Sequence, residues 1–148
     1  MVCSTLPVIV VQIIRYPYEP NDISGYPPFI EDLLNIRDAG QTHALRAIGG
    51  MVRDLRQQGT ACRYLKALTG YPILELKTRA RGGETGGARV YLYRADDTEF
   101  HLCAAETKQG DTPSRILLER TALIALAWHK NLEIFPETRA AKRIRRHP

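Results

Sequence analysis

The stretch over residues 74–113 constrains the fold most, because three runs in it alternate apolar and polar residues. A period of two is typical of strands that bury one face. The runs begin near Leu74, Ala88 and Glu99. The glycine-rich RARGGETGG joins the first two, and Asp96-Asp97 suits a tight turn before the third. The pattern therefore predicts three neighbouring strands in one sheet.

The alternation also sorts the side chains of these strands onto two faces. The predicted core face holds Leu74, Leu76, Thr78, Ala88, Val90, Leu92, Phe100, Leu102 and Ala104. The other face, which we expect to be open, holds Glu75, Lys77, Arg79, Arg89, Tyr91, Tyr93, Glu99, His101 and Cys103. Cations, tyrosines, carboxylates and an imidazole on one open face suit the phosphate chemistry of RNA.

The rest of the chain predicts helices on both sides of these strands in sequence. Apolar residues recur at helical spacing over 29–36 and 45–55, and Gly49-Gly50 indicates a close helix–helix contact. Thr112 suits the N-cap and Pro113 the first residue of a helix that extends to about residue 132. The segment TALIALAW in its second half should pack deeply. Residues 7–15 predict a buried strand, 16–28 a proline-rich connection, and 63–72 a short crossing segment. The expected fold is α+β, a small and mainly antiparallel sheet with two helices before its central strands and one C-terminal helix.

Length and cysteine usage indicate one globular domain, which we place at residues 1–137 with a basic C-terminal arm at 138–148. Cys3, Cys62 and Cys103 are odd in number and widely spaced, which favours a reducing cytoplasm over a disulfide framework. The apolar run VIVVQII is too short to span a membrane. The four histidines show no ligand spacing with each other or with the cysteines, so we expect neither a metal nor a cofactor.

The charge is unevenly distributed along the chain. Twenty-one Lys and Arg residues against 16 Asp and Glu give a net charge of +5 and a pI near 9.3. Residues 77–94 contain five of the cations, and residues 139–146 contain five more. This distribution favours a polyanionic partner.

Four sequence motifs resemble the RelE toxin superfamily, and more narrowly its phage-derived, HigB-like branch. They are LRQQG followed by RYLKALTG, LELK at Leu74–Lys77, RVYLY at 89–93, and ETKQGDTP at 106–113, within a matched region of about residues 44–131. Lys77 stands where that branch has an arginine. The resemblance implies a ribosome-dependent mRNA endonuclease, the toxin of a type II toxin–antitoxin pair that a helix-turn-helix antitoxin silences.

Cleavage of RNA without a metal uses its own 2′-OH as nucleophile and needs groups that move protons and stabilise the phosphorus charge. The candidate catalytic residues are Arg89, Lys77, Lys108, Glu75 and His101. The candidate RNA-binding residues are Arg79, Tyr91, Tyr93, Arg143, Arg145 and Arg146. Structural alternatives stay open, namely a pairing of Arg89 with Glu75 across the sheet, a packing role for His101, and a tyrosine buried under a helix.

Two other functions are compatible with the same residues. The first is a catalytically weakened RelE-like protein that binds RNA or a partner through its basic face and arm. The second is a DNA-associated accessory protein of a phage or mobile element, whose binding would depend steeply on salt.

Overall fold

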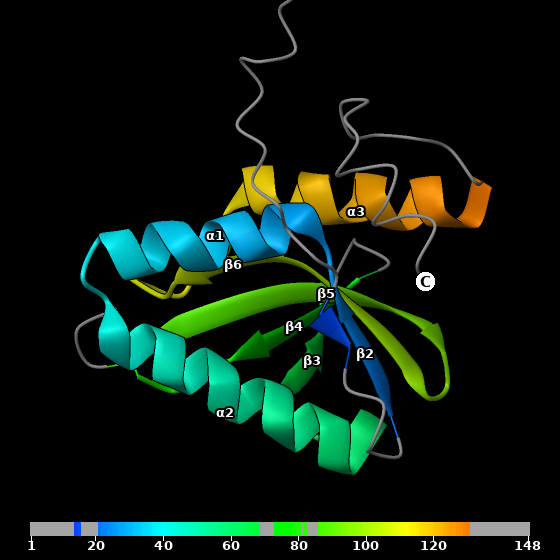
Figure 1. Cartoon of the computed structure of the whole chain (residues 1–148), viewed down its shortest axis with the longest axis horizontal. Coiled ribbons are helices and arrows are strands. Elements are labelled where there is room, and N and C mark those ends of the chain that lie inside the picture. The colour runs from blue at the N-terminus through cyan, green and yellow to red at the C-terminus, as the bar shows by residue number, and fades with distance from the viewer. Residues whose placement is uncertain (1–13, 16–20, 69–72, 81, 83–85, 131–148) are drawn as a thin grey trace, which may run out of the picture.

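The computed structural model describes residues 14–15, 21–68, 73–80, 82 and 86–130 (Figure 1). Most of the predicted strand at 7–15 and the whole basic arm at 138–148 therefore lie outside the described residues. The described helices are α1 (Pro27–Asp38), α2 (Thr42–Gln58) and α3 (Arg115–Lys130), with a short 3-10 turn at Gly59–Ala61. The strands are β1 (Ile14–Arg15), β2 (Asp22–Gly25), β3 (Leu65–Ala67), β4 (Leu74–Lys77), β5 (Ala88–Asp96) and β6 (Glu99–Thr107). The predicted α+β class is confirmed, with two helices before the central strands and one after them.

The strands form one mixed sheet in the order β1-β2-β6-β5-β4-β3. Every neighbouring pair is antiparallel except β2 and β6, which run parallel. The prediction that all of residues 16–28 form a connection was wrong, since β2 lies within them. Backbone bonds from Asp22 N to Thr98 O (2.7 Å) and from Tyr26 N to Leu102 O (3.0 Å) attach this segment to β6. The predicted crossing segment likewise contains strand β3. Both short strands satisfy backbone groups that β6 and β4 would otherwise leave at an edge.

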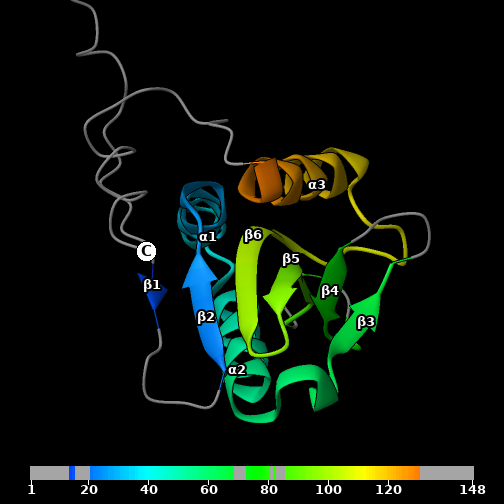
Figure 2. The same cartoon turned by 90° about the vertical axis from the view of Figure 1, so that its right-hand side faces the viewer.

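Helices cover both faces of the sheet. One face packs against α1 and α2 in a core that includes Leu76, Val90 and Phe100. The other face packs against α3 in a second cluster around Tyr91 and Tyr93. Figure 1 and Figure 2 show the strands between α2 and α3. The face that we expected to be open is therefore buried, because α3 returns along it after β6.

A β-bulge in β6 changes the alternation that the sequence predicts. Tyr91 pairs with Ala104 and Leu92 pairs with Leu102, so Cys103 is one extra residue on β6. Each side chain that follows the extra residue therefore lies on the face opposite to the one that simple alternation predicts. Ala104 consequently packs in the cluster under α3, and Ala105 takes the expected place in the core beneath α1 and α2.

Helix α3 differs from its prediction at its start and in its packing. It begins at Arg115 instead of Pro113, and the residue that caps it is Ser114, whose Oγ accepts the N–H of Leu117 at 3.4 Å. Leu118 and Ile124 are buried against the sheet. The deep packing expected for TALIALAW is only partial. Leu123 and Leu126 are exposed, as is Ile116 earlier in the helix, and Trp128 is 41% exposed although its ring contacts His101.

The two glycines in the middle of α2 do not mark a close contact between helices. Gly49 and Gly50 are both exposed, and a Cβ at either position would meet no described atom within 4 Å apart from the adjacent residues and the backbone of α2 itself. Each glycine costs about 1 kcal/mol relative to alanine in a helix interior. Gly59 is different, since it ends α2 with a φ of 57° that favours glycine.

The described helices include none that is both long and apolar enough to cross a membrane.

Candidate functional site

Arg89 lies on β5 beneath the start of α3 and is almost completely buried, with 1% of its surface exposed. Its Nη1 donates to Oε2 of Glu75 on β4 at 2.5 Å, and its Nη2 donates to the carbonyl of Gly110 at 2.7 Å. Both partners of the ion pair are buried, so each charge compensates the other. The pairing of Arg89 with Glu75 that the sequence left open as a structural alternative is therefore present.

Lys108 joins two loops at the same end of the sheet. Its Nζ donates to the carbonyl oxygens of Thr78 at 2.6 Å and of Arg79 at 3.4 Å. Its backbone accepts from Gly82 N at 2.5 Å and donates to Gly87 O at 2.9 Å. The ammonium group is buried and bonded to backbone, and the loop that follows β6 is thereby fixed to the connection between β4 and β5.

Lys77 and Arg79 are the more accessible cations of this end. Lys77 is half-buried and lies opposite Arg89 in the ladder between β4 and β5. Arg79 is exposed, two residues further along the chain. These side chains, with Arg89 and Lys108, place four cations from three segments near one pair of loops. We call this group the basic end of the sheet.

A carboxylate that the sequence analysis did not single out belongs to the same end. Glu106 on β6 lies opposite Arg89 in the ladder. Its Oε2 accepts hydrogen bonds from the Tyr91 hydroxyl and, at 3.0 Å, from the backbone N–H of Ser114. Burial, followed by the hydrogen bond to Glu106, raises the pKa of Tyr91 well above its usual value. The motif ETKQGDTP contained Glu106, but only the bulge in β6 places it on this face.

His101 and Tyr93 lie at the other end of the face beneath α3. The His101 ring stacks on Tyr93 with centroids 4.8 Å apart and contacts Trp128 at 4.6 Å. Its Nε2 is hydrogen-bonded to Oε2 of Glu99 at 2.6 Å. The Tyr93 hydroxyl lies 3.4 Å from that of Tyr26. We call these residues the aromatic end of the sheet.

The structure thus separates the predicted site residues into two groups. Arg89 and Tyr93 lie on the same strand four residues apart, which corresponds to about 13 Å of extended chain. His101 pairs with Tyr93 in the ladder and is not near the phosphate-binding candidates. Both predicted stacking tyrosines are buried, Tyr91 completely and Tyr93 to 2% exposure. The remaining RNA-binding candidates, Arg143, Arg145 and Arg146, lie outside the described residues.

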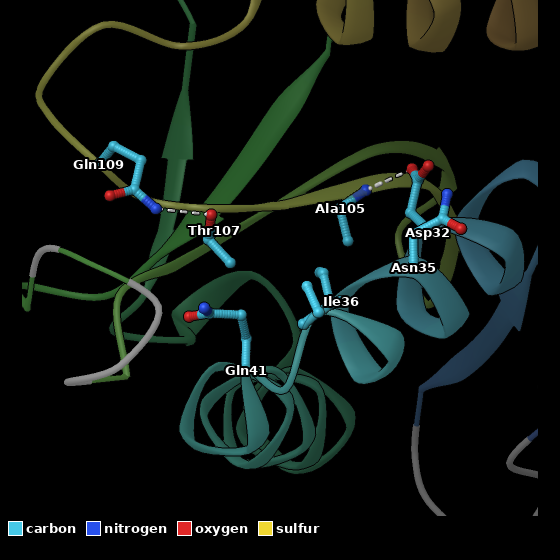
Figure 3. Close-up of a pocket in the computed structure, with 8 residues that line it drawn as sticks. Asp32, Asn35, Ile36, Gln41, Ala105, Thr107 and Gln109 are labelled. Carbon is cyan, nitrogen blue, oxygen red and sulfur yellow. Dashed lines mark hydrogen bonds between the residues drawn. The ribbon is translucent and has the colours of Figure 1, made fainter.

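A pocket of about 280 Å³ with polar and apolar lining lies on the opposite side of β6, between the end of α1 and the start of α2 (Figure 3). Its polar lining residues include Asp32, Asn35, Gln41, Thr107 and Gln109. Asp32 accepts the Ala105 N–H at 2.9 Å, and Gln109 donates to the Thr107 hydroxyl at 2.9 Å. The Gln41 Oε1 is buried without a hydrogen-bond partner among the described residues.

In the part of the chain that the structure describes, no three His, Cys, Asp or Glu side chains are grouped closely enough to hold a metal ion. No protein-family model matches the sequence, and no curated protein matches it. The fold and the arrangement of side chains are therefore the basis for assigning a function.

Proposed function

We propose that this chain is a RelE-like toxin of a type II toxin–antitoxin system, a metal-independent endonuclease that cuts mRNA on the ribosome and so inhibits translation. A helix-turn-helix antitoxin is the expected partner. An α+β fold with two helices before the central strands and one after them is compatible with this proposal, and the main motifs of the resemblance lie in β4, β5 and the loop after β6.

The observation that carries the proposal is the basic end of the sheet. Lys77, Arg79, Arg89 and Lys108 come from three segments, and hydrogen bonds of Lys108 and Arg89 hold these segments together. Concentrated cations attract a polyanion and supply charge where phosphate oxygens become more negative. Arginine suits the second task best, because its planar guanidinium binds two phosphate oxygens at once.

In the proposed reaction Arg89 binds the scissile phosphate after its Nη2 exchanges the Gly110 carbonyl for a phosphate oxygen. Glu75 holds the other side of the guanidinium and fixes its orientation. The 2′-OH attacks phosphorus to form a 2′,3′-cyclic phosphate, and its proton passes to a carboxylate of this end. The 5′-oxygen leaves as its bond to phosphorus breaks and takes a proton from a water molecule. Glu106 and Glu75 are the carboxylates nearest to Arg89 in the ladder.

A second candidate keeps the fold and lacks the chemistry. In this case the chain is a catalytically weakened RelE-like protein that binds RNA or a partner. The specific observation in its favour is that Arg89 and Glu75 are buried and neutralise each other. A buried pair of this kind can be explained by its structural role alone, without any substrate.

The test maps mRNA 5′ ends in cells after induction of the chain from a tightly controlled promoter. Arg89→Ala leaves Glu75 as a buried charge, so lost activity in that variant alone would not separate chemistry from unfolding. The double variant Glu75→Leu/Arg89→Met replaces the pair by apolar side chains of similar size and should stay folded. Arg94→Ala is the matched control, an exposed arginine on the same strand.

We expect new 5′ ends within translated frames for the wild type and for Arg94→Ala, and none for the folded double variant. Cleavage by the double variant at the wild-type level would remove Arg89 and Glu75 from the chemistry. Unchanged mRNA with folded wild-type protein would refute the nuclease and leave the binding protein as the better description.

A further inference from the structure

The middle of α2 has a composition that packing among the described residues does not explain. Gly49 and Gly50 are adjacent and exposed on a 17-residue helix. Glycine weakens a helix interior, and it is favoured where another backbone must approach closely. Apart from the adjacent residues and the backbone of α2 itself, no described atom lies within 4 Å of the position that a Cβ would occupy on either glycine. The close approach that would account for these glycines is therefore one from outside the described fold.

A groove of about 290 Å³ begins beside Gly49, between α1 and α2. Its apolar lining consists of Phe29, Leu33, Leu45, Ile48, Val52 and Leu102. Leu33 and Leu45 are only partly buried, so apolar surface is accessible in the groove. Apolar grooves between helices accept the hydrophobic side chains of a protein segment, whereas nucleic acid is bound by phosphate contacts and base stacking.

The charges around this groove are positive. Arg53 and Arg56 line it, and no acidic residue does. Arg46, Gly49, Gly50 and Arg53 follow one another at spacings that share one face of a helix, so exposed arginines lie about one turn on each side of the glycines. A second copy of this chain would bring these arginines against their counterparts. An acidic segment would neutralise them.

We propose that the groove between α1 and α2 docks an amphipathic helix of a partner protein, with acidic side chains that face Arg46 and Arg53. The partner's apolar side chains enter the groove, and its backbone crosses α2 at Gly49, where the missing side chain allows a short distance between the two helix axes. The affinity comes from the apolar anchors, and the arginines select for acidic flanks. This inference does not depend on the proposed nuclease, because the groove lies on the face of the sheet opposite Arg89.

The test is a selection of helical 16-residue peptides from a randomised library against the full-length chain. Selected peptides are then measured by fluorescence anisotropy against variants of the groove and matched controls. Gly49→Leu fills the crossing point, and Arg53→Glu reverses the charge at the rim. The controls are Gln58→Leu, on the same helix outside the groove lining, and Arg94→Glu, on a distant hairpin. Thermal unfolding checks that each variant is folded, which we expect since no described atom crowds Gly49.

We expect the selected peptides to have an apolar face flanked by Asp or Glu. Their affinity should fall at least tenfold with Gly49→Leu and with Arg53→Glu, and by less than twofold with the two controls. Binders without acidic flanks, binding insensitive to both groove variants, or failure to recover a binder would overturn the proposal. Single-stranded RNA that binds the wild type and loses affinity with Arg53→Glu, in the absence of such peptides, would also overturn it and assign the arginines to RNA.

Discussion

The basic end and the aromatic end of the sheet lie under the same helix and are held together by different forces. At the basic end Arg89, Glu75, Tyr91 and Glu106 form charged and polar contacts, and Lys108 bonds to backbone carbonyls. At the aromatic end the His101 ring contacts the rings of Tyr93 and Trp128. Hydrogen bonds join His101 to Glu99 and the Tyr93 hydroxyl to that of Tyr26. A network of buried charges fails when one member is lost, whereas a packed cluster loses free energy in proportion to the volume removed.

This difference shows why a face with a suitable list of residues need not be one site. Tyr93 and His101 share the sheet face with Arg89. Their own contacts are with other rings, because His101 contacts Tyr26 and Trp128 and Tyr93 contacts His129. Among the predicted site residues that the structure describes, the more accessible cations are Lys77 and Arg79, which lie at the basic end next to the loops. Function that depends on phosphate binding should therefore respond to changes at the basic end, and changes at the aromatic end should act through stability.

The largest effect should follow Arg89→Ala. The variant leaves the Glu75 carboxylate buried without its partner at 2.5 Å, and a broken buried pair of this kind costs about 3–5 kcal/mol. Urea denaturation followed by circular dichroism measures the free energy of unfolding. The double variant Glu75→Leu/Arg89→Met should recover most of that loss. A loss below about 1 kcal/mol for Arg89→Ala would mean that water reaches Glu75 and that the pair is not isolated from solvent.

Tyr93→Ala should have the next largest effect, about 3 kcal/mol, because it removes a buried ring that stacks on His101. The same denaturation experiment measures it. Measuring RNA affinity gives a second comparison of the two ends. A folded Tyr93→Leu variant should bind RNA as tightly as the wild type does. A tenfold loss of RNA affinity in that variant would place Tyr93 in contact with RNA.

Tyr91→Phe should cost about 2 kcal/mol, the usual value for a hydrogen bond to a charged acceptor. The change removes the hydroxyl that donates to Glu106 and leaves the ring in place. Tyr93→Phe is the matched control, because its hydroxyl faces another hydroxyl at 3.4 Å. Equal losses of unfolding free energy in the two variants would contradict the proposed difference between the charged contacts of the basic end and the neutral contacts of the aromatic end.

The smallest effect for one residue and one pH unit comes from the ionisation of two buried tyrosines. Burial is the first cause of the raised pKa of both Tyr91 and Tyr93. Above pH 10 the unfolded chain loses phenolic protons that the folded chain retains, so the free energy of unfolding falls as pH rises, by up to about 1.4 kcal/mol per pH unit for each tyrosine. Below pH 10 this contribution to stability is complete. Denaturation curves between pH 9 and 11.5 should show the decline, and the double variant Tyr91→Phe/Tyr93→Phe should show a shallower one.

Local sequence patterns predicted the fold class and most elements. Alternation identified β4, β5 and β6, and helical spacing identified α1 and α2, because in each case neighbours in sequence share one buried face. Strands β2 and β3 escaped this reasoning. They have four and three residues, too few for a period, and they form because β6 and β4 offer backbone partners.

The candidate site was predictable only in part. Arg89 and Glu75 were identified as neighbours on one face, and their direct pairing was one of two open interpretations. Glu106 could not be assigned to that face, because a single extra residue at Cys103 reverses the alternation after it. Asp32 gave no signal either, since its partners, the Ala105 N–H and the Arg120 guanidinium, are more than 70 residues away in sequence.

The sequence by itself determined what short-range geometry controls, namely the periods of strands and helices, the turns at glycine and proline, and the excess of cations around β4 and β5. Tertiary structure alone decided exposure. Whether Arg89, Lys108 and Tyr91 face solvent depends on where α3 lies after β6, and that position depends on burial of Leu118 and Ile124 against a distant strand pair. Free energy of burial is a property of contacts between remote segments, so no pattern within one segment can specify it.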